Sequence, residues 1–179
     1  LPLKRLIIGG MDRVYEIGRI FRNEGMDTKH NPEFTTVELY QAYADFHTMM
    51  DIAEGILASA AMELHGSYQV EWLGETVDLT PGWRRLTMVD AVKEYAGVDF
   101  GVISDDAQAV EAAKAIGVEL PEAAEKTWGN ALYACFDQKV EEKLIQPTFI
   151  TMYPVEVSPL TKRSPQDTRT DRKSTRLNS

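Results

Sequence analysis

Two segments near the start of the chain alternate between apolar and polar residues, and a loop separates them. The first is residues 13–23 (RVYEIGRIFRN), and the second is residues 34–43 (FTTVELYQAY). Strict alternation is typical of half-buried β-strands, because successive side chains of a strand point to opposite faces. Gly25 and the dipeptide Asn31-Pro32 mark the intervening residues as a loop. The pattern therefore predicts an antiparallel hairpin with a long loop.

The same alternation assigns the side chains of this hairpin to two faces. One face is mostly apolar and is suited to packing on helices; it includes Tyr15, Ile17, Phe21, Val37 and Leu39. The other face collects polar and aromatic side chains: Arg22, Glu24, Phe34, Glu38 and Tyr40. A polar strand face is ordinarily a solvated surface with cross-strand ion pairs, and this interpretation stays open for the hairpin.

Three features of the polar face favour a ligand site instead. Its carboxylates outnumber its arginine, which suits a cationic ligand better than pairing within the face. Phe34 supplies an aromatic plane, and the loop residues Lys29, His30 and Asn31 can reach phosphates or the edge of a base. Arg22 is of the residue type that grips a phosphate or a carboxylate with two parallel hydrogen bonds. Together these residues predict a pocket for a molecule with a planar base, a phosphate and an amine.

The rest of the chain predicts helices between strands. A short apolar run at residues 5–8, closed by two glycines, predicts a strand. The remaining expected elements are a helix at 46–64, a small hairpin at 68–79, helices at 88–95, 105–116 and 126–144, and a strand at 147–153. Thr87 and Asp90 predict a capping box at the start of the helix at 88–95. This order predicts an α+β fold, with an antiparallel sheet and a helical insertion.

Composition narrows the class of protein. The 179 residues are enough for one domain with a core, and no segment has the apolar length that crosses a membrane. Cys135 is the single cysteine, so an intrachain disulfide is excluded, and we expect its side chain in the core. A chain with one cysteine and no membrane-spanning segment is expected in the cytoplasm. The net charge is −9, and the first 160 residues carry −13, which argues against a broad basic surface for nucleic acid.

The end of the chain has no hydrophobic period. Residues 164–179 (SPQDTRTDRKSTRLNS) are polar and predict a disordered tail. The stretch DRKSTRLNS also resembles one reading frame of a widely used sequencing-library adapter, so we interpret residues 164–179 as a non-native, adapter-derived tail and residues 1–163 as the folded domain.

The hairpin sequence FRNEGMDTKHNPEFTTVELYQAYADF resembles motif 2 of class II aminoacyl-tRNA synthetases, and specifically of the lysyl-tRNA synthetase family. The stretches LKRLIIGGMDRVYEIGRIFRNEG and KLIQPTFITMYPVEVSPLTKR are similar to the same family. The resemblance implies a partial class II catalytic domain over residues 1–163 that contains motif 2 and an insertion. Motif 1, an anticodon-binding OB-fold domain and motif 3 are expected outside it.

The resemblance also implies a role for each residue of the polar face. Arg22 would be the catalytic residue, holding the α-phosphate of ATP and the carboxylate of lysine. The other implied ATP contacts are Glu24, His30, Asn31 (through its backbone) and Phe34. Glu38 and Tyr40, together with Arg22, would bind lysine, while Glu156 and Ser158 would lie near the mouth of the site.

The implied activity is that of a lysine–tRNA ligase, which uses ATP and Mg²⁺ and acts on lysine and tRNA(Lys) as a homodimer. The metal ligands are expected outside these residues, and residues 1–179 alone are expected to be inactive. The segment NPEFTTVELY is less similar to the enzymes of the same subclass that act on aspartate or asparagine. Three further interpretations stay open: a lysine ligase that modifies a protein, a non-catalytic synthetase-like binding module, and a structural protein with a polar sheet face.

Overall fold

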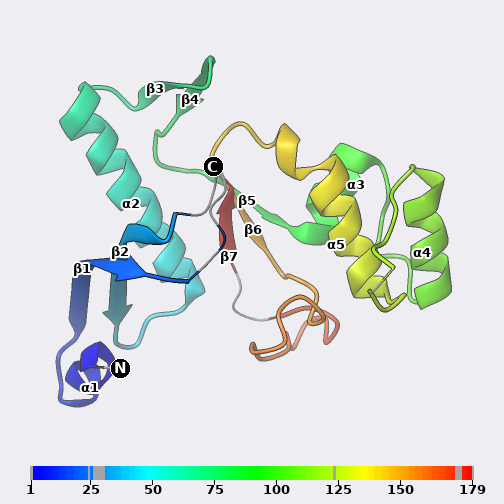
Figure 1. The fold of residues 1–179 in the computed structure, drawn as a ribbon, viewed down its shortest axis with the longest axis horizontal. Coiled ribbons are helices and arrows are strands. Elements are labelled where there is room, and N and C mark those ends of the chain that lie inside the picture. The colour runs from blue at the N-terminus through cyan, green and yellow to red at the C-terminus, as the bar shows by residue number, and fades with distance from the viewer. Residues whose placement is uncertain (1, 24, 26–30, 123, 172–174, 179) are drawn as a thin grey trace. The chain divides into compact units, whose positions relative to one another are not determined.

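The computed structural model describes residues 2–23, 25, 31–122, 124–171 and 175–178, the last four by backbone only. The chain is a mixture of helices and small sheets, in which two compact units comprise residues Leu1–Asp45 and Phe46–Ser179. The helices are α1 (Pro2–Ile8), α2 (Phe46–His65), α3 (Met88–Ala96), α4 (Asp106–Ala115), α5 (Trp128–Lys139) and the short 3-10 helix η1 (Glu141–Lys143) (Figure 1). The strands are β1 (Arg13–Phe21), β2 (Glu33–Gln41), β3 (Gln69–Trp72), β4 (Glu75–Asp78), β5 (Arg84–Thr87), β6 (Thr148–Thr151) and β7 (Thr175–Asn178).

The first unit is the predicted hairpin together with one helix. Strands β1 and β2 pair antiparallel without interruption from Arg13 opposite Gln41 to Phe21 opposite Glu33, which confirms both strands and their pairing. The predicted strand at residues 5–8 is wrong, because this run belongs to helix α1. Pro2 begins that helix, where a missing N–H costs nothing, and Leu3 is the residue that it buries.

The second unit is built around a helical core. Helix α5 contacts both α3 and α4 and lies between them (Figure 1). Thr87, Asp105 and Thr127 are the N-caps of α3, α4 and α5, each accepting a hydrogen bond from a backbone N–H of the first turn. The largest of the fully buried side chains in this core include Met88, Phe100, Leu132 and Val140. The expected helical insertion is therefore present, with the cap predicted at Thr87.

Cys135 lies in this core with no exposed surface, as the sequence predicts. Burial raises the pKa of its thiol to about 11, because the thiolate would lose the solvation of water. Cys135 is therefore a packing residue of α5.

A three-stranded sheet, in the order β5-β6-β7, adjoins the helical core. Strand β6 pairs antiparallel with β7 but parallel with β5, so the prediction of a wholly antiparallel sheet is wrong for this part. The reason is that helices α3, α4 and α5 connect β5 to β6, and a connection of that length allows two strands to run in the same direction. Strand β5 was not predicted, because the run RRLT lacks alternation.

Residues 164–171 form a segment that packs on the helical core, and we call it the C-terminal strap. Ser164, Thr170 and Asp171 are buried, and the backbone N–H of Ser164 donates to the carbonyl of Thr170 at 2.8 Å. The predicted disorder is therefore wrong for residues 164–171, and neither of the two compact units ends at the predicted boundary of 163/164. The adapter origin of the last residues stays a prediction.

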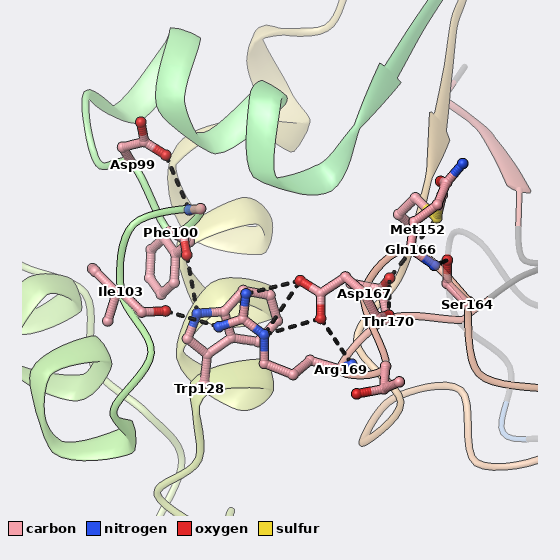
Figure 2. A network of polar contacts seen from close by, with 12 residues as sticks. Asp99, Phe100, Ile103, Trp128, Met152, Ser164, Gln166, Asp167, Arg169 and Thr170 are labelled. Carbon is pink, nitrogen blue, oxygen red and sulfur yellow. Dashed lines mark hydrogen bonds and ion pairs between the residues drawn. The ribbon is translucent and has the colours of Figure 1, made fainter.

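Arg169 attaches the strap to the helical core through contacts with residues that are far away in the sequence (Figure 2). Its guanidinium lies 4.0 Å from the ring centroid of Trp128 and donates to the carbonyl of Ile103 at 2.8 Å. It also forms an ion pair with Asp167 at 2.8 Å. The same contact lowers the pKa of the Asp167 carboxyl and raises the pKa of Arg169.

Among the residues that the structure describes, no helix is both long enough and apolar enough to cross a membrane.

Candidate functional site

The register of the hairpin decides which predicted site residues share a face. Side chains of directly opposed residues lie on the same side of an antiparallel pair. Phe34 is opposite Ile20, Glu38 is opposite Glu16, and Tyr40 is opposite Val14. The backbone N–H of Arg22 donates to the carbonyl of Pro32 at 2.9 Å, which continues the pairing beyond the last rung of the ladder.

Arg22 and Phe34 lie together at one end of this face. The Arg22 guanidinium carbon is 5.6 Å from the centroid of the Phe34 ring, within the range of a cation–π contact. Arg22 is exposed and Phe34 is half-buried. A positive charge beside an aromatic plane is an arrangement that can bind a phosphate and stack on a base.

Glu38 and Tyr40 lie toward the other end of the same face. The Tyr40 hydroxyl donates to Oε2 of Glu38 at 3.4 Å, so the two residues act as a pair. Glu16 lies directly opposite Glu38, which puts two carboxylates of the same charge on one rung of the ladder. Like charges directly opposite each other repel, and a bound cation would relieve this repulsion. The arrangement therefore favours the binding of a cation between the two carboxylates.

Lys4 of α1 also contacts this end of the face. Its Nζ atom is 5.6 Å from the centroid of the Tyr40 ring, so an ammonium group already lies near the pair formed by Tyr40 and Glu38. Sequence reasoning missed Lys4, because the apolar run at residues 5–8 predicts a strand. The helical spacing of Leu3, Leu6 and Ile7 was the signal that could have found it.

The loop between the strands contains the remaining predicted contacts. The Oδ1 atom of Asn31 accepts from the backbone N–H of Glu33 at 3.2 Å, which uses its side chain to shape the entry into β2. The backbone of Asn31, which is the part expected to contact a base, is not engaged by this bond. Glu24 and His30 lie outside the described residues, so their predicted roles stay predictions.

The opposite face of the hairpin is apolar, as predicted, and it is exposed. Tyr15, Ile17 and Phe21 each expose more than 60% of their surface. Arg19 belongs to this face and pairs with Glu33 at 2.9 Å. Arg19 of β1 and Arg22, which follows the end of β1, therefore lie on opposite faces of one hairpin.

The second unit contains a separate cavity of about 460 Å³. Helices α2 and α3, strands β5 and β6, and the strap contribute to its lining, through residues that include Met50, Asp90, Arg85, Thr151 and Gln166. None of the predicted site residues that the structure describes lines this cavity. The predicted site is instead an open sheet face.

Glu156, which the family resemblance implies near the mouth of the site, packs against α5. A Cβ atom added to Gly129 would come within 2.1 Å of Oε2 of Glu156, so the carboxylate occupies the space left by that glycine. No group of three or more His, Cys, Asp or Glu side chains in the described part of the chain is arranged to hold a metal ion.

Comparisons with known proteins agree with the sequence and the hairpin. The family of class II tRNA synthetases (D, K and N) matches residues 1–178. The lysine–tRNA ligase of Thermoanaerobacter sp. (strain X514) is 53% identical over 163 residues, which cover 91% of this chain and 32% of that protein. The lysine–tRNA ligase of Staphylococcus haemolyticus (strain JCSC1435) is 54% identical over 173 residues, which cover 96% of this chain and 34% of that protein.

The chain spans about a third of the length of these curated relatives. The family match nevertheless continues through both compact units, from the hairpin to the sheet that follows the helical core. On the strength of that continuous match, we conclude that this chain belongs to the class II tRNA synthetase family of the D, K and N type.

Proposed function

We propose that the chain is part of a lysine–tRNA ligase, which activates lysine with ATP to form lysyl-adenylate and transfers the lysyl group to tRNA(Lys). The observation that supports this most is the shared face of the hairpin, where Arg22 and Phe34 lie together at one end and Glu38 and Tyr40 toward the other. The names of the relatives support lysine as the amino acid.

In this proposal each end of the face binds one part of the reactants. Phe34 stacks on the adenine of ATP, and Glu24, His30 and the backbone of Asn31 provide further contacts to the base and the phosphates. Glu38 and Tyr40 bind an amino group of lysine, because a paired carboxylate and phenol offer a charged and a neutral acceptor.

Arg22 carries the chemistry by position and charge. The lysine carboxylate is already a nucleophile and attacks the α-phosphorus in line, while pyrophosphate leaves. Arg22 contacts both the carboxylate and the α-phosphate, which brings the reacting atoms together and stabilises the negative charge on the phosphoryl oxygens. No side chain of the face has to transfer a proton.

The other participants belong to the whole enzyme. The site fits ATP because a cationic and an aromatic side chain adjoin each other, and bound Mg²⁺ would neutralise charge on the phosphates through ligands outside these residues. We also propose tRNA(Lys) as the acceptor, a homodimer as the assembly and the cytoplasm as the location.

The test compares two arginines that differ in the face they occupy. Residues 1–171 are grafted into the lysine–tRNA ligase of S. haemolyticus in place of the matched segment, and lysine-dependent exchange between ATP and pyrophosphate is measured. Arg22→Ala should lower exchange by about 100- to 1,000-fold, the usual cost of removing one contact to a developing charge. The control Arg19→Ala loses only an exposed ion pair with Glu33 and should change exchange by less than about threefold. Equal effects of the two substitutions, or an exchange that aspartate or asparagine supports as well as lysine, would contradict the proposal.

A further inference from the structure

Gly18 lies in the middle of strand β1, where glycine has no evident structural use. Its φ angle is not among the positive ones of the described glycines, so its backbone conformation is open to any residue. The ladder passes through Gly18 without a bulge, since Gly18 pairs with Thr36 between two regular rungs. Glycine inside a strand lowers stability by about 0.5–1 kcal/mol relative to alanine.

Close packing does not explain this glycine either. A Cβ atom added at Gly18 would meet no heavy atom of the described residues within 4 Å. Gly129 shows the contrary case, because a Cβ there would meet Glu156 within 2.1 Å. A glycine inside a strand that is neither at a bulge nor against other parts of the protein is the kind of position that a ligand approaches closely.

The location of Gly18 identifies the ligand, on the basis of the function proposed above. Gly18 and Thr36 form the rung between Phe34 and Glu38, on the same face. Phe34 and Glu38 are four positions apart, or about 13 Å along a strand. A molecule that stacks on Phe34 and also reaches Glu38 therefore has to cross the rung of Gly18.

We propose that Gly18 is a specificity-determining residue. Because it has no side chain, its backbone forms the surface on which the central part of lysyl-adenylate lies; we call this surface the floor. The low rung of Gly18 and Thr36 lets the ribose and phosphoryl groups lie close to the main chain, while the base and the amino group bind at either side. A side chain at position 18 would lift the centre of the ligand and prevent both ends from binding together.

The experiment titrates the 179-residue chain, labelled with ¹⁵N, with lysine and with lysyl-sulfamoyl-adenosine, a stable analogue of lysyl-adenylate, and follows backbone amide shifts by NMR. The series Gly18→Ala, Gly18→Val and Gly18→Ile adds one, three and four carbon atoms to the floor. Affinity for the analogue should fall progressively along the series, by at least about tenfold for Gly18→Ile, or 1.4 kcal/mol. Affinity for free lysine, which does not have to cross the rung, should change by less than about threefold.

The control Thr35→Ile replaces one β-branched side chain by a larger one on the opposite face of the hairpin, next to Gly18 in space but away from the ligand. It should leave the affinity for the analogue unchanged. Amide exchange of β1 should stay equal or become slower in the Gly18 series, because β-branched residues favour strands.

The outcomes separate this inference from the function on which it rests. If the unsubstituted chain shows no shifts in the hairpin with either ligand, the proposed function is contradicted. If the unsubstituted chain binds and Gly18→Ile binds equally well, the floor is not at Gly18. If Gly18→Ile loses the dispersed amide signals of β1 and β2, glycine serves the fold, and the inference is overturned in that way.

Discussion

The contacts of Arg169 predict that the C-terminal strap opens as a unit when this side chain loses its guanidinium group but keeps an apolar stem. Arg169→Met keeps the apolar stem and removes the guanidinium, so the lost interactions are the polar ones. These are the hydrogen bond to the carbonyl of Ile103 and the stacking on Trp128 (Figure 2). The ion pair with Asp167 is more than one-third exposed and contributes about 0.2–1 kcal/mol, less than these two contacts.

The magnitude follows from the two contacts that cross to the helical core. A hydrogen bond from a charged donor contributes about 1.5–3 kcal/mol, and a partly desolvated cation–π contact about 0.5–2 kcal/mol. Because both depend on one guanidinium, their energies are not independent, and we take about 2–3 kcal/mol for the pair. This corresponds to an increase of about 30- to 150-fold in the equilibrium constant for opening of the strap.

Amide hydrogen exchange measures this opening directly. The backbone N–H groups of Ser164 and Asp171 are both bonded within the folded chain, to the carbonyls of Thr170 and Tyr153. Their exchange should accelerate by the same factor in Arg169→Met, while amides of α5 keep their protection. The matched control is Arg163→Met, which removes an exposed arginine that donates a long hydrogen bond of 3.4 Å to the Thr168 carbonyl.

Two results would refute this reasoning. If exchange at Ser164 and Asp171 stays within about threefold of the unsubstituted chain, the contacts of Arg169 do not hold the strap. If protection is lost to the same extent in α5, the strap and the helical core unfold together and the strap is not a separate unit. Arg169→Lys should be intermediate, because lysine keeps the charge but not the planar group that stacks on the indole.

Two further predictions concern ionisable groups of the second unit. The Asp167 carboxyl has a folded pKa below its ordinary value of 3.8, because Arg169 donates to it, so its stabilisation is complete above pH 3.8 and is lost as the pH falls through the lowered folded value. The protection factor of the Asp171 amide, which is its exchange rate relative to that of an unfolded chain at the same pH, should therefore fall in that acidic range, and should fall less in Asp167→Asn; an equal fall in both would contradict the prediction. The thiol of Cys135, with a pKa of about 11 and no exposed surface, should not react with a thiol reagent at about pH 8 until the chain is unfolded in urea. Rapid labelling of the native chain would show that α5 opens far more readily than its packing implies.

The parts of the fold that depend on periodic burial could be predicted from the sequence. The alternation in residues 13–23 and 34–43 predicted both strands of the hairpin and the side chains on each face, because register in a hairpin is tied to a period of two. Helix α3 was predicted with its cap, because Thr87 and Asp90 bond within four residues of each other. Local signals of this kind need no knowledge of the tertiary structure.

The parts that depend on single contacts could not be predicted. Pro2–Ile8 is a short apolar run, and in such a run the period of a helix and that of a strand are hard to distinguish. The strap is polar by composition, and its order rests on backbone hydrogen bonds and on an arginine that meets an indole from a distant helix. No periodic pattern in the sequence indicates a contact between residues 128 and 169. The prediction for this segment therefore relied on its polar composition, which indicated disorder.

Gly18 and Gly129 show why the candidate site in particular needed the structure. In the sequence the two glycines are similar, since each interrupts a regular element that alanine would stabilise. The structure gives Gly129 a local reason, because the carboxylate of Glu156 fills the space beside its Cα atom. It gives Gly18 no such reason, and it puts Gly18 between the two ends of a face that groups Arg22 with Phe34 and Tyr40 with Glu38. Gly18 weakens its strand, and a Cβ added to it would meet no atom of the described residues within 4 Å, as the proposal of a ligand close to the main chain requires. In that proposal the absence of a side chain is as informative about the ligand as the charged groups around it.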